Sequence, residues 1–139
     1  MKESKPALSR TQAMKLLRAA AQVSRNAHAP YSKFHVGAAL LTNTGSIITG
    51  CNVENASYGL TICAERNAIF HAVATKRRTF KAVAIVASGK QLPFPCGACR
   101  QVLAEFGTPD MTVLVAPRDK LATYKELTLG ELLPHSFKF

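Results

Sequence analysis

The chain has 139 residues, of which 47% are hydrophobic, enough for the core of one domain. It contains no apolar run long enough to span a membrane and no apolar signal stretch near its start, so we expect a cytoplasmic protein without membrane contact. The net charge of +10, from 18 basic and 8 acidic residues, would suit nucleic-acid binding. However, the basic residues are scattered and lack interleaved aromatic residues, which favours a solvated surface, so we do not expect a nucleic-acid partner.

The N-terminal part is predicted to be a tail followed by a helix. Residues 1–9 read as a flexible tail, and residues 10–139 as one domain. The helix is capped by Ser9 or Thr11 and runs to about Ala27, with its apolar positions largely on one face. It must end before Pro30, which cannot continue it.

A β-hairpin is predicted next, with apolar segments over 34–41 and 47–52 joined by a turn at 43–46. The segment 53–61 reads as a polar loop. A second helix over 63–75 follows, for which Thr61 can serve as the N-cap.

Strands and helices alternate in the remainder of the chain. We expect strands over 81–87 and 111–116, a helix over 96–106, a short fifth strand over 121–124, and a short final helix over 128–133. This order predicts an α/β fold, in which a mixed sheet of about five strands lies between two layers of helices.

Four cysteines stand at positions 51, 63, 96 and 99. Because no signal peptide precedes them, metal binding is a better interpretation than disulfides. Cys63, Cys96 and Cys99 lie at the starts of two predicted helices, where the helix dipole favours thiolates. We interpret these three as ligands of one Zn²⁺ per chain, with the fourth position open to water, and Cys51 as a buried strand thiol.

Glu65 and two arginines stand beside the predicted ligands. Glu65 lies two residues after Cys63, so its carboxylate can face the open position and exchange protons without binding the metal. Three thiolates would leave the site negative, and either Arg66 or Arg100 could donate hydrogen bonds to the sulfurs.

A cysteine followed two residues later by glutamate, and then by Pro-Cys-x-x-Cys, is the signature of zinc deaminases. From Ala29 to Phe137 the chain resembles the small homotetrameric, three-cysteine cytidine deaminases, through segments 29–34, 36–40, 50–58, 63–66, 95–103 and 132–134. The resemblance implies the cytidine deaminase fold and a catalytic domain over 10–139. It also implies hydrolysis of cytidine and deoxycytidine to uridine and deoxyuridine with release of ammonia, in pyrimidine salvage.

The resemblance also implies roles for residues around the base and the ribose. Phe34 would pack against the pyrimidine, and Asn52 and Glu54 would bind the ribose hydroxyls. The backbone of Ala64 and the carboxylate of Glu65 would bind the amide edge of the base. Glu65 would take a proton from water and protonate ring N3, and it would then deliver a proton to the leaving amine.

Neighbouring subunits complete the site in the family that the chain resembles. Ala56 and Tyr58 would reach a neighbour's ribose, and Phe137 would stack on a neighbour's base. One departure is Phe94, which stands before the Pro-Cys pair where a smaller residue is expected and which puts the rim of the pocket in question.

Three other functions are compatible with parts of the pattern. A polynucleotide cytosine deaminase would suit the basic charge, but Glu54 would repel a phosphate at the ribose 3′ position. A deaminase of a cytosine nucleoside analogue would share the metal chemistry. A non-catalytic zinc module would need a fourth ligand, and the only spare cysteine, Cys51, is predicted to lie on a strand.

Overall fold

The computed structural model describes residues 8–137. Its centre is one mixed five-stranded sheet in the order β2-β1-β3-β4-β5, in which β3 and β4 are parallel and all other neighbours are antiparallel. The strands are β1 (Val36–Thr42), β2 (Ile47–Cys51), β3 (Phe80–Ala87), β4 (Thr112–Pro117) and β5 (Lys125–Thr128). The predicted mixed sheet and α/β class are confirmed.

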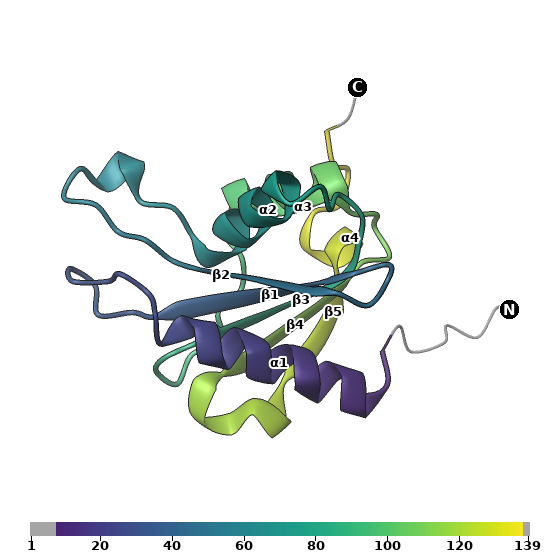
Figure 1. The fold of residues 1–139 in the computed structure, drawn as a ribbon, viewed down its shortest axis with the longest axis horizontal. Coiled ribbons are helices and arrows are strands. Elements are labelled where there is room, and N and C mark those ends of the chain that lie inside the picture. Colours follow the sequence, from purple (N-terminus) through teal and green to yellow (C-terminus); the bar gives the residue numbers. More distant parts are fainter. Residues whose placement is uncertain (1–7, 138–139) are drawn as a thin grey trace, which may run out of the picture.

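Helices cover both faces of this sheet, which gives the predicted three layers (Figure 1). α1 lies on one face together with a short 3₁₀ segment, and α2, α3 and the short α4 lie on the other. The helices are α1 (Arg10–Ser24), α2 (Ala64–Ala74), α3 (Gly97–Phe106) and α4 (Leu129–Leu132), with short 3₁₀ segments η1 (Tyr58–Leu60) and η2 (Arg118–Thr123). None of the helices within residues 8–137 has the length and apolar character that crossing a membrane requires.

α1 begins and ends close to the predicted positions, with two differences. Ser9 forms a capping box with Gln12, and Leu8 is buried, so both residues belong to the folded domain and not to the predicted tail; residues 1–7 of that tail lie outside the described residues. The helix ends at Ser24 instead of Ala27. There the chain leaves the helix axis, and the backbone N–H of His28 donates to the carbonyl of Asn52 on the neighbouring segment.

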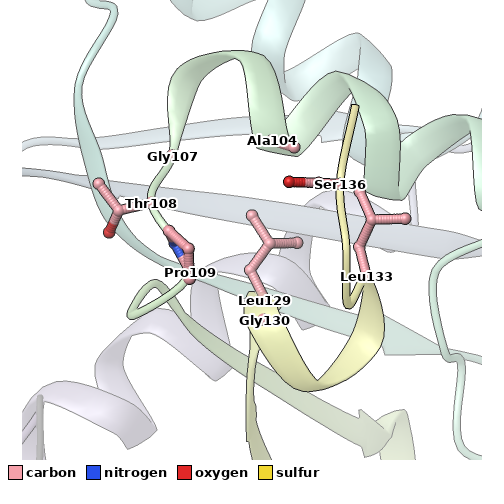
Figure 2. A pocket seen from close by; sticks show the side chains of 8 residues that line it. All are labelled: Ala104, Gly107, Thr108, Pro109, Leu129, Gly130, Leu133 and Ser136. Carbon is pink, nitrogen blue, oxygen red and sulfur yellow. The ribbon is translucent and has the colours of Figure 1, made fainter. Parts of the chain in front are cut away.

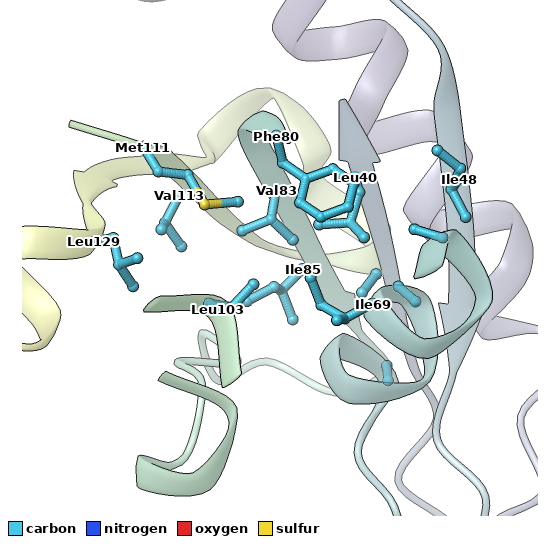
Figure 3. Close-up of a cluster of buried hydrophobic side chains, with 14 of the residues drawn as sticks. Leu40, Ile48, Ile69, Phe80, Val83, Ile85, Leu103, Met111, Val113 and Leu129 are labelled. Atoms are coloured by element: carbon cyan, nitrogen blue, oxygen red, sulfur yellow. The ribbon is translucent and has the colours of Figure 1, made fainter. Parts of the chain in front are cut away.

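The two faces of the sheet carry side chains of different size. Toward α2 and α3, β3 presents Val83 and Ile85, which pack with Ile69 and Leu103 (Figure 3). Toward α1, β3 presents Ala82 and Ala84, along with Val86. The alanines are short, so α1 can lie close to the sheet on that side.

The predicted fifth strand is wrong in position. Residues 121–124 lie in and just after η2, where Leu121 and Tyr124 pack against the core under α1. The edge strand is instead β5, whose sequence KELT is exposed at its first two positions. The hydrophobic pattern therefore predicted a strand in the segment that packs against the core, and it did not predict the polar strand that pairs with β4.

The N-cap of α2 is also corrected. Cys63 occupies the N-cap position, whereas the hydroxyl of Thr61 accepts a hydrogen bond from the backbone of Asn55. Cys63 is thereby held at the start of the helix by the helix geometry itself.

The C-terminal segment packs under α3. The backbone N–H groups of Leu129 and Gly130 donate to the carbonyls of Met111 and Pro109, and Leu129 lies near Ala104 (Figure 2). The hollow between these segments has a volume of about 10 Å³, room for at most one water molecule. It is a packing defect and not a ligand site.

Gly37 sets the distance between α1 and β1, and its replacement by alanine should destabilise the fold. The added Cβ would clash with the carbonyl oxygen of Ala20 and lie 2.7 Å from the backbone nitrogen of Ser24, both in the backbone of α1. We expect Gly37→Ala to lower the free energy of unfolding by about 1–3 kcal/mol or more, measured by urea denaturation. Gly59→Ala is the control, because its added methyl has open space; equal loss in both variants would contradict this packing.

Candidate active site

Three cysteine sulfurs meet where α2 and α3 begin. Cys63 is the N-cap of α2, Cys96 is the N-cap of α3, and Cys99 lies in the first turn of α3. Their Sγ atoms all lie within 4.8 Å of one another, and those of Cys63 and Cys96 are 3.9 Å apart. Two helix N-termini therefore converge on one point, as the sequence predicted.

The geometry of this cluster fits a metal and excludes disulfides. A disulfide has an S–S distance of about 2.05 Å, whereas tetrahedral thiolates about 2.3 Å from a zinc ion lie about 3.8 Å from one another. All four cysteines are free thiols, and Cys51 in β2 is not part of the cluster. The cluster offers three sulfur ligands, which leaves one position of a tetrahedral ion for water.

The pKa values of the Cys63 and Cys99 thiols shift in opposite directions. The hydrogen bond with Cys99, supported by Arg66, lowers the pKa of Cys63 to about 5. The same contact, together with burial, raises the pKa of Cys99. Cys63 is thus a thiolate at neutral pH, which is the state that binds a metal.

The structure separates the two arginines that were predicted to contact the sulfurs. The Nη2 of Arg66 donates to the Sγ of Cys63 at 3.5 Å, while its buried Nε has no partner. Arg100 instead donates to the carbonyls of Pro95, at 2.7 Å, and Leu132, at 2.8 Å. Its expected bond to a sulfur is wrong, because its side chain runs back along the loop before α3 and toward the C-terminal segment; Arg100 holds that loop in place.

Glu65 is buried beside the cluster. Its side chain is 4% exposed, and burial raises its pKa to about 7. Burial of a carboxylate destabilises its charged form. The resulting pKa near neutrality suits a group that both accepts and donates protons. Glu65 lines the same cavity as Cys63 and Cys96.

This cavity has a volume of about 180 Å³. Its walls come from five parts of the chain: the segment that leads into β1, the residue after β2, the start of α2, β3, and the loop before α3. The predicted residues Phe34, Asn52, Ala64 and Glu65 line it together with Val36, Thr61, Cys63, Ile85, Pro93, Phe94 and Cys96. Ligand pockets commonly measure about 300–1,000 Å³, so this space suits a single ring more than a whole nucleoside.

Asn52 fixes the wall that carries Phe34. Its Oδ1 accepts from the backbone of Val36 at 2.8 Å, and its Nδ2 donates to the carbonyl of Phe34 at 2.8 Å. The ring of Phe34 remains 41% exposed. The predicted contact of Asn52 with ribose stays a prediction.

Glu54 lies in a second, more open hollow that shares Thr61 with the cavity. Its carboxylate accepts from the backbone N–H groups of Tyr31, at 3.0 Å, and Ser32, at 3.1 Å, and from the hydroxyl of Ser32. The Ser32 hydroxyl contributes most to lowering the pKa of Glu54, so the carboxylate is ionised and held in place. Sequence reasoning missed the part played by Ser32, although it stands inside one of the matching segments.

The remaining predicted residues lie outside the cavity of their own chain. Tyr58 is 77% exposed and borders the second hollow, Phe137 is 66% exposed, and Ala56 is exposed on the loop before η1. A contact of these three residues with another subunit stays a prediction.

Phe94 forms part of the cavity wall, which answers the question raised by its size. Its ring is 43% exposed, and the ammonium of Lys125 lies 5.7 Å from its centroid. The large side chain is therefore accommodated in the cavity wall, and the three sulfur atoms still form one cluster.

Comparison with known proteins agrees with this geometry. Residues 10–115 match the family described as "Cytidine and deoxycytidylate deaminase zinc-binding region". The chain belongs to this deaminase family. A cytidine deaminase from Halalkalibacterium halodurans is 49% identical over 122 residues, which is 88% of this chain and 91% of that protein. The crystal structure of a cytidine deaminase from Burkholderia pseudomallei superposes with a TM-score of 0.84 at 44% identity, over 94% of this chain and all of that one.

One relative of this chain is named for another substrate. The blasticidin-S deaminase from Bacillus cereus is 33% identical over 111 residues, which is 74% of this chain and 76% of that protein. Its identity to this chain is lower than that of the cytidine deaminase from H. halodurans.

Zinc content should depend on the cluster and not on Cys51. We expect Cys99→Ser to reduce bound zinc from one per chain to a small fraction, because a hard hydroxyl replaces one of three thiolate ligands. Metal analysis of purified protein measures this. Cys51→Ser is the matched control and should retain zinc; equal zinc in both variants would show that the cluster is not the binding site.

Proposed function

We propose that this chain is a zinc-dependent cytidine aminohydrolase, which converts cytidine and deoxycytidine with water to uridine and deoxyuridine and ammonia, in pyrimidine salvage. The observation that carries this proposal is the buried Glu65 carboxylate beside a three-sulfur cluster, in one cavity with Phe34. Family membership supports the same reaction.

The residues of the cavity divide the chemistry between them. Zinc, when bound by Cys63, Cys96 and Cys99, supplies a Lewis acid that makes water a nucleophile near neutral pH. Glu65 takes a proton from the attacking water and delivers it to N3 of the ring. It then takes the second proton, from the hydroxyl group added at C4, and delivers it to the amine, which leaves as ammonia. A pKa near 7 suits both transfers. Arg66 offsets the charge on the sulfur of Cys63.

Substrate binding follows from the walls of the two hollows. Phe34 packs against the pyrimidine, and the backbone of Ala64 with Glu65 holds its amide edge. One of the two amide hydrogens of Asn52 donates to Phe34, and the other is left to donate to a ribose hydroxyl. The carboxylate of Glu54 can accept further hydrogen bonds, including one from a ribose hydroxyl. These roles are supported by the position of the residues around two adjoining hollows, which share Thr61 as a lining residue.

We also infer a homotetramer in which Ala56 and Tyr58 reach a neighbour's ribose and Phe137 stacks on a neighbour's base. The exposure of Tyr58 and Phe137 supports this, because large exposed aromatic side chains mark contact surfaces. The cavity of one chain is also small for a nucleoside. A cytoplasmic location belongs to the same proposal, since a cluster of free cysteines suits a reducing compartment.

The rival activities differ in the groups they would place near Glu54. A polynucleotide would bring a phosphate toward this ionised carboxylate, which costs free energy. An analogue that lacks ribose hydroxyls would leave Asn52 and Glu54 without the partners proposed for them. Both arguments favour an unmodified nucleoside.

Replacement of the proton-transfer group should separate metal binding from turnover. We expect zinc-loaded wild-type protein to release ammonia from cytidine and deoxycytidine, and Glu65→Gln to keep zinc but lose about 10²–10⁴-fold in turnover. The loss of cytidine absorbance, together with metal analysis, measures both properties.

Parallel assays with blasticidin S and with a cytosine-containing single-stranded oligonucleotide are the substrate controls. Turnover of either at a rate above that of cytidine would overturn the choice of substrate. Wild-type turnover by Glu65→Gln would overturn the mechanism, and bound zinc without ammonia release from any of these compounds would indicate a non-catalytic module.

Sharing of sites between subunits can be tested by complementation. Glu65→Gln and Phe137→Ala should each be impaired, yet a mixture of the two, dissociated and reassociated, should regain activity. Hybrid assemblies would contain sites with a native Glu65 from one chain and a native Phe137 from its neighbour. A mixture of Glu65→Gln with Cys99→Ser, both defective within one chain's own cluster, is the control. Activity no greater than the sum of the parents would contradict a shared site.

A further inference from the structure

A separate hollow, of about 110 Å³, lies on the α1 face of the sheet and at the other end of β1 from the active-site cavity. Val36 at the start of β1 lines the active-site cavity, and Leu41 near its end lines this hollow. The floor is apolar, from Leu16, Leu41 and Ile47, and the polar side chains are Gln12, Lys15 and Lys81. A site for one water needs only about 10–15 Å³, so this space holds a group of several atoms.

A β-bulge brings Lys81 to this side of the sheet. In the pairing of β1 with β3, Leu41 faces Ala82 but Thr42 faces Phe80, so Lys81 is the extra residue. Phe80 points into the core under α2, whereas Lys81 lines the hollow with Lys15 of α1. Bulges commonly re-aim a side chain in this way.

The polar groups of the hollow are donors and cations. The Oε1 of Gln12 accepts from the backbone of Ser9 in the capping box, which leaves its amide hydrogens free to donate. Within residues 8–137, neither lysine ammonium makes a hydrogen bond or ion pair, and no carboxylate lines the hollow. Gln12 and Lys15 are exposed and Lys81 is half-buried, so these donors are open to an anionic acceptor from solution.

The surroundings extend the positive charge. No aspartate or glutamate occurs from Ser4 to Val53, and Arg18 lies exposed on α1 near Lys15. The exposed segment Lys76–Arg78 comes just before β3 and adjoins the turn after β1, where Asn43 donates to the carbonyl of Thr79.

We propose that this hollow binds a phosphate group, held by Lys15, Lys81 and the amide of Gln12. Lysine ammonium groups suit phosphate as point charges, and the phosphate oxygens would supply the missing acceptors. None of the large exposed hydrophobic side chains of residues 8–137 lies on α1, so the surface lacks what insertion into a bilayer needs. The phosphate belongs either to a small phosphate ester or to a nucleic-acid backbone.

Calorimetric titration of the zinc-loaded protein tests the proposal with two probes, pyrophosphate and a short cytosine-free oligonucleotide. Neither probe contains the base that the active site is proposed to bind. We expect binding of at least one probe, weakening with added salt, and roughly tenfold or more weaker in the K15Q/K81Q variant. K90Q, which removes the same charge from an exposed loop residue after β3, should bind as the wild type does.

The two arms distinguish the source of the phosphate. If pyrophosphate binds and the double variant Arg77→Gln/Arg78→Gln does not weaken its binding, the ligand is a small phosphate ester. If the oligonucleotide binds and the same double variant weakens its binding, the ligand is a nucleic-acid backbone that crosses the segment Lys76–Arg78. No binding of either probe to the wild type, or unchanged binding in K15Q/K81Q, would overturn the proposal. Wild-type turnover of cytidine by K15Q/K81Q confirms that the variant is folded and separates this test from that of the enzymatic function.

Discussion

The active site depends on two helix N-termini meeting at one end of the sheet. The parallel pair of β3 and β4 requires a crossover, and α3 is that crossover, so α3 must begin beyond the C-terminal end of β3. α2 lies against α3 on the same face. With Cys63 and Cys96 as the N-caps, the fold itself sets the distances among the sulfurs.

The position of Glu65 one residue into α2 comes at a cost to stability. Burial moves its pKa from 4.5 to about 7, and one unit corresponds to about 1.4 kcal/mol, so ionising it in the folded, zinc-free chain costs on the order of 3 kcal/mol. The pKa of Glu65 is higher in the folded state than in the unfolded state. Its contribution to the stability of the fold is therefore fully present below about pH 4.5, and it is lost as the pH rises through about 7. A group placed for packing alone would not be retained at this cost, which agrees with a role in proton transfer.

The parts of the fold that hydrophobic pattern controls were predictable from the sequence. β3 and β4 are continuous apolar runs, and the helix starts carry residues whose spacing alone indicates the chemistry, so Cys63, Glu65 and Cys96 could be found. β5 was misplaced because it is a polar edge strand beside a more apolar 3₁₀ segment. Edge pairing is decided by the neighbouring strand and leaves little trace in composition.

Side-chain direction was the other limit of sequence reasoning. Arg66 and Arg100 both directly follow a site residue, yet one reaches a sulfur and the other reaches two carbonyls. Spacing along a helix gives the face a residue occupies, but the length of an arginine allows several partners around that face. The functions proposed for Ala56, Tyr58 and Phe137 involve a neighbouring chain, which one chain's sequence cannot position.

The positive charge of the chain has no use in the proposed reaction. A cytosine nucleoside is neutral, so the electric field of a +10 protein does not steer it toward the cavity. In the sequence the basic residues are dispersed, which argued against a binding surface. The fold brings several of these cations to one end of the sheet: Lys15 on α1, Lys81 in the β-bulge, and the loop Lys76–Arg78. In the sequence, the described acidic residues other than Glu54 and Glu65 all follow Ala104. A group of cations that has no role toward a neutral substrate agrees with a second ligand that is itself an anion.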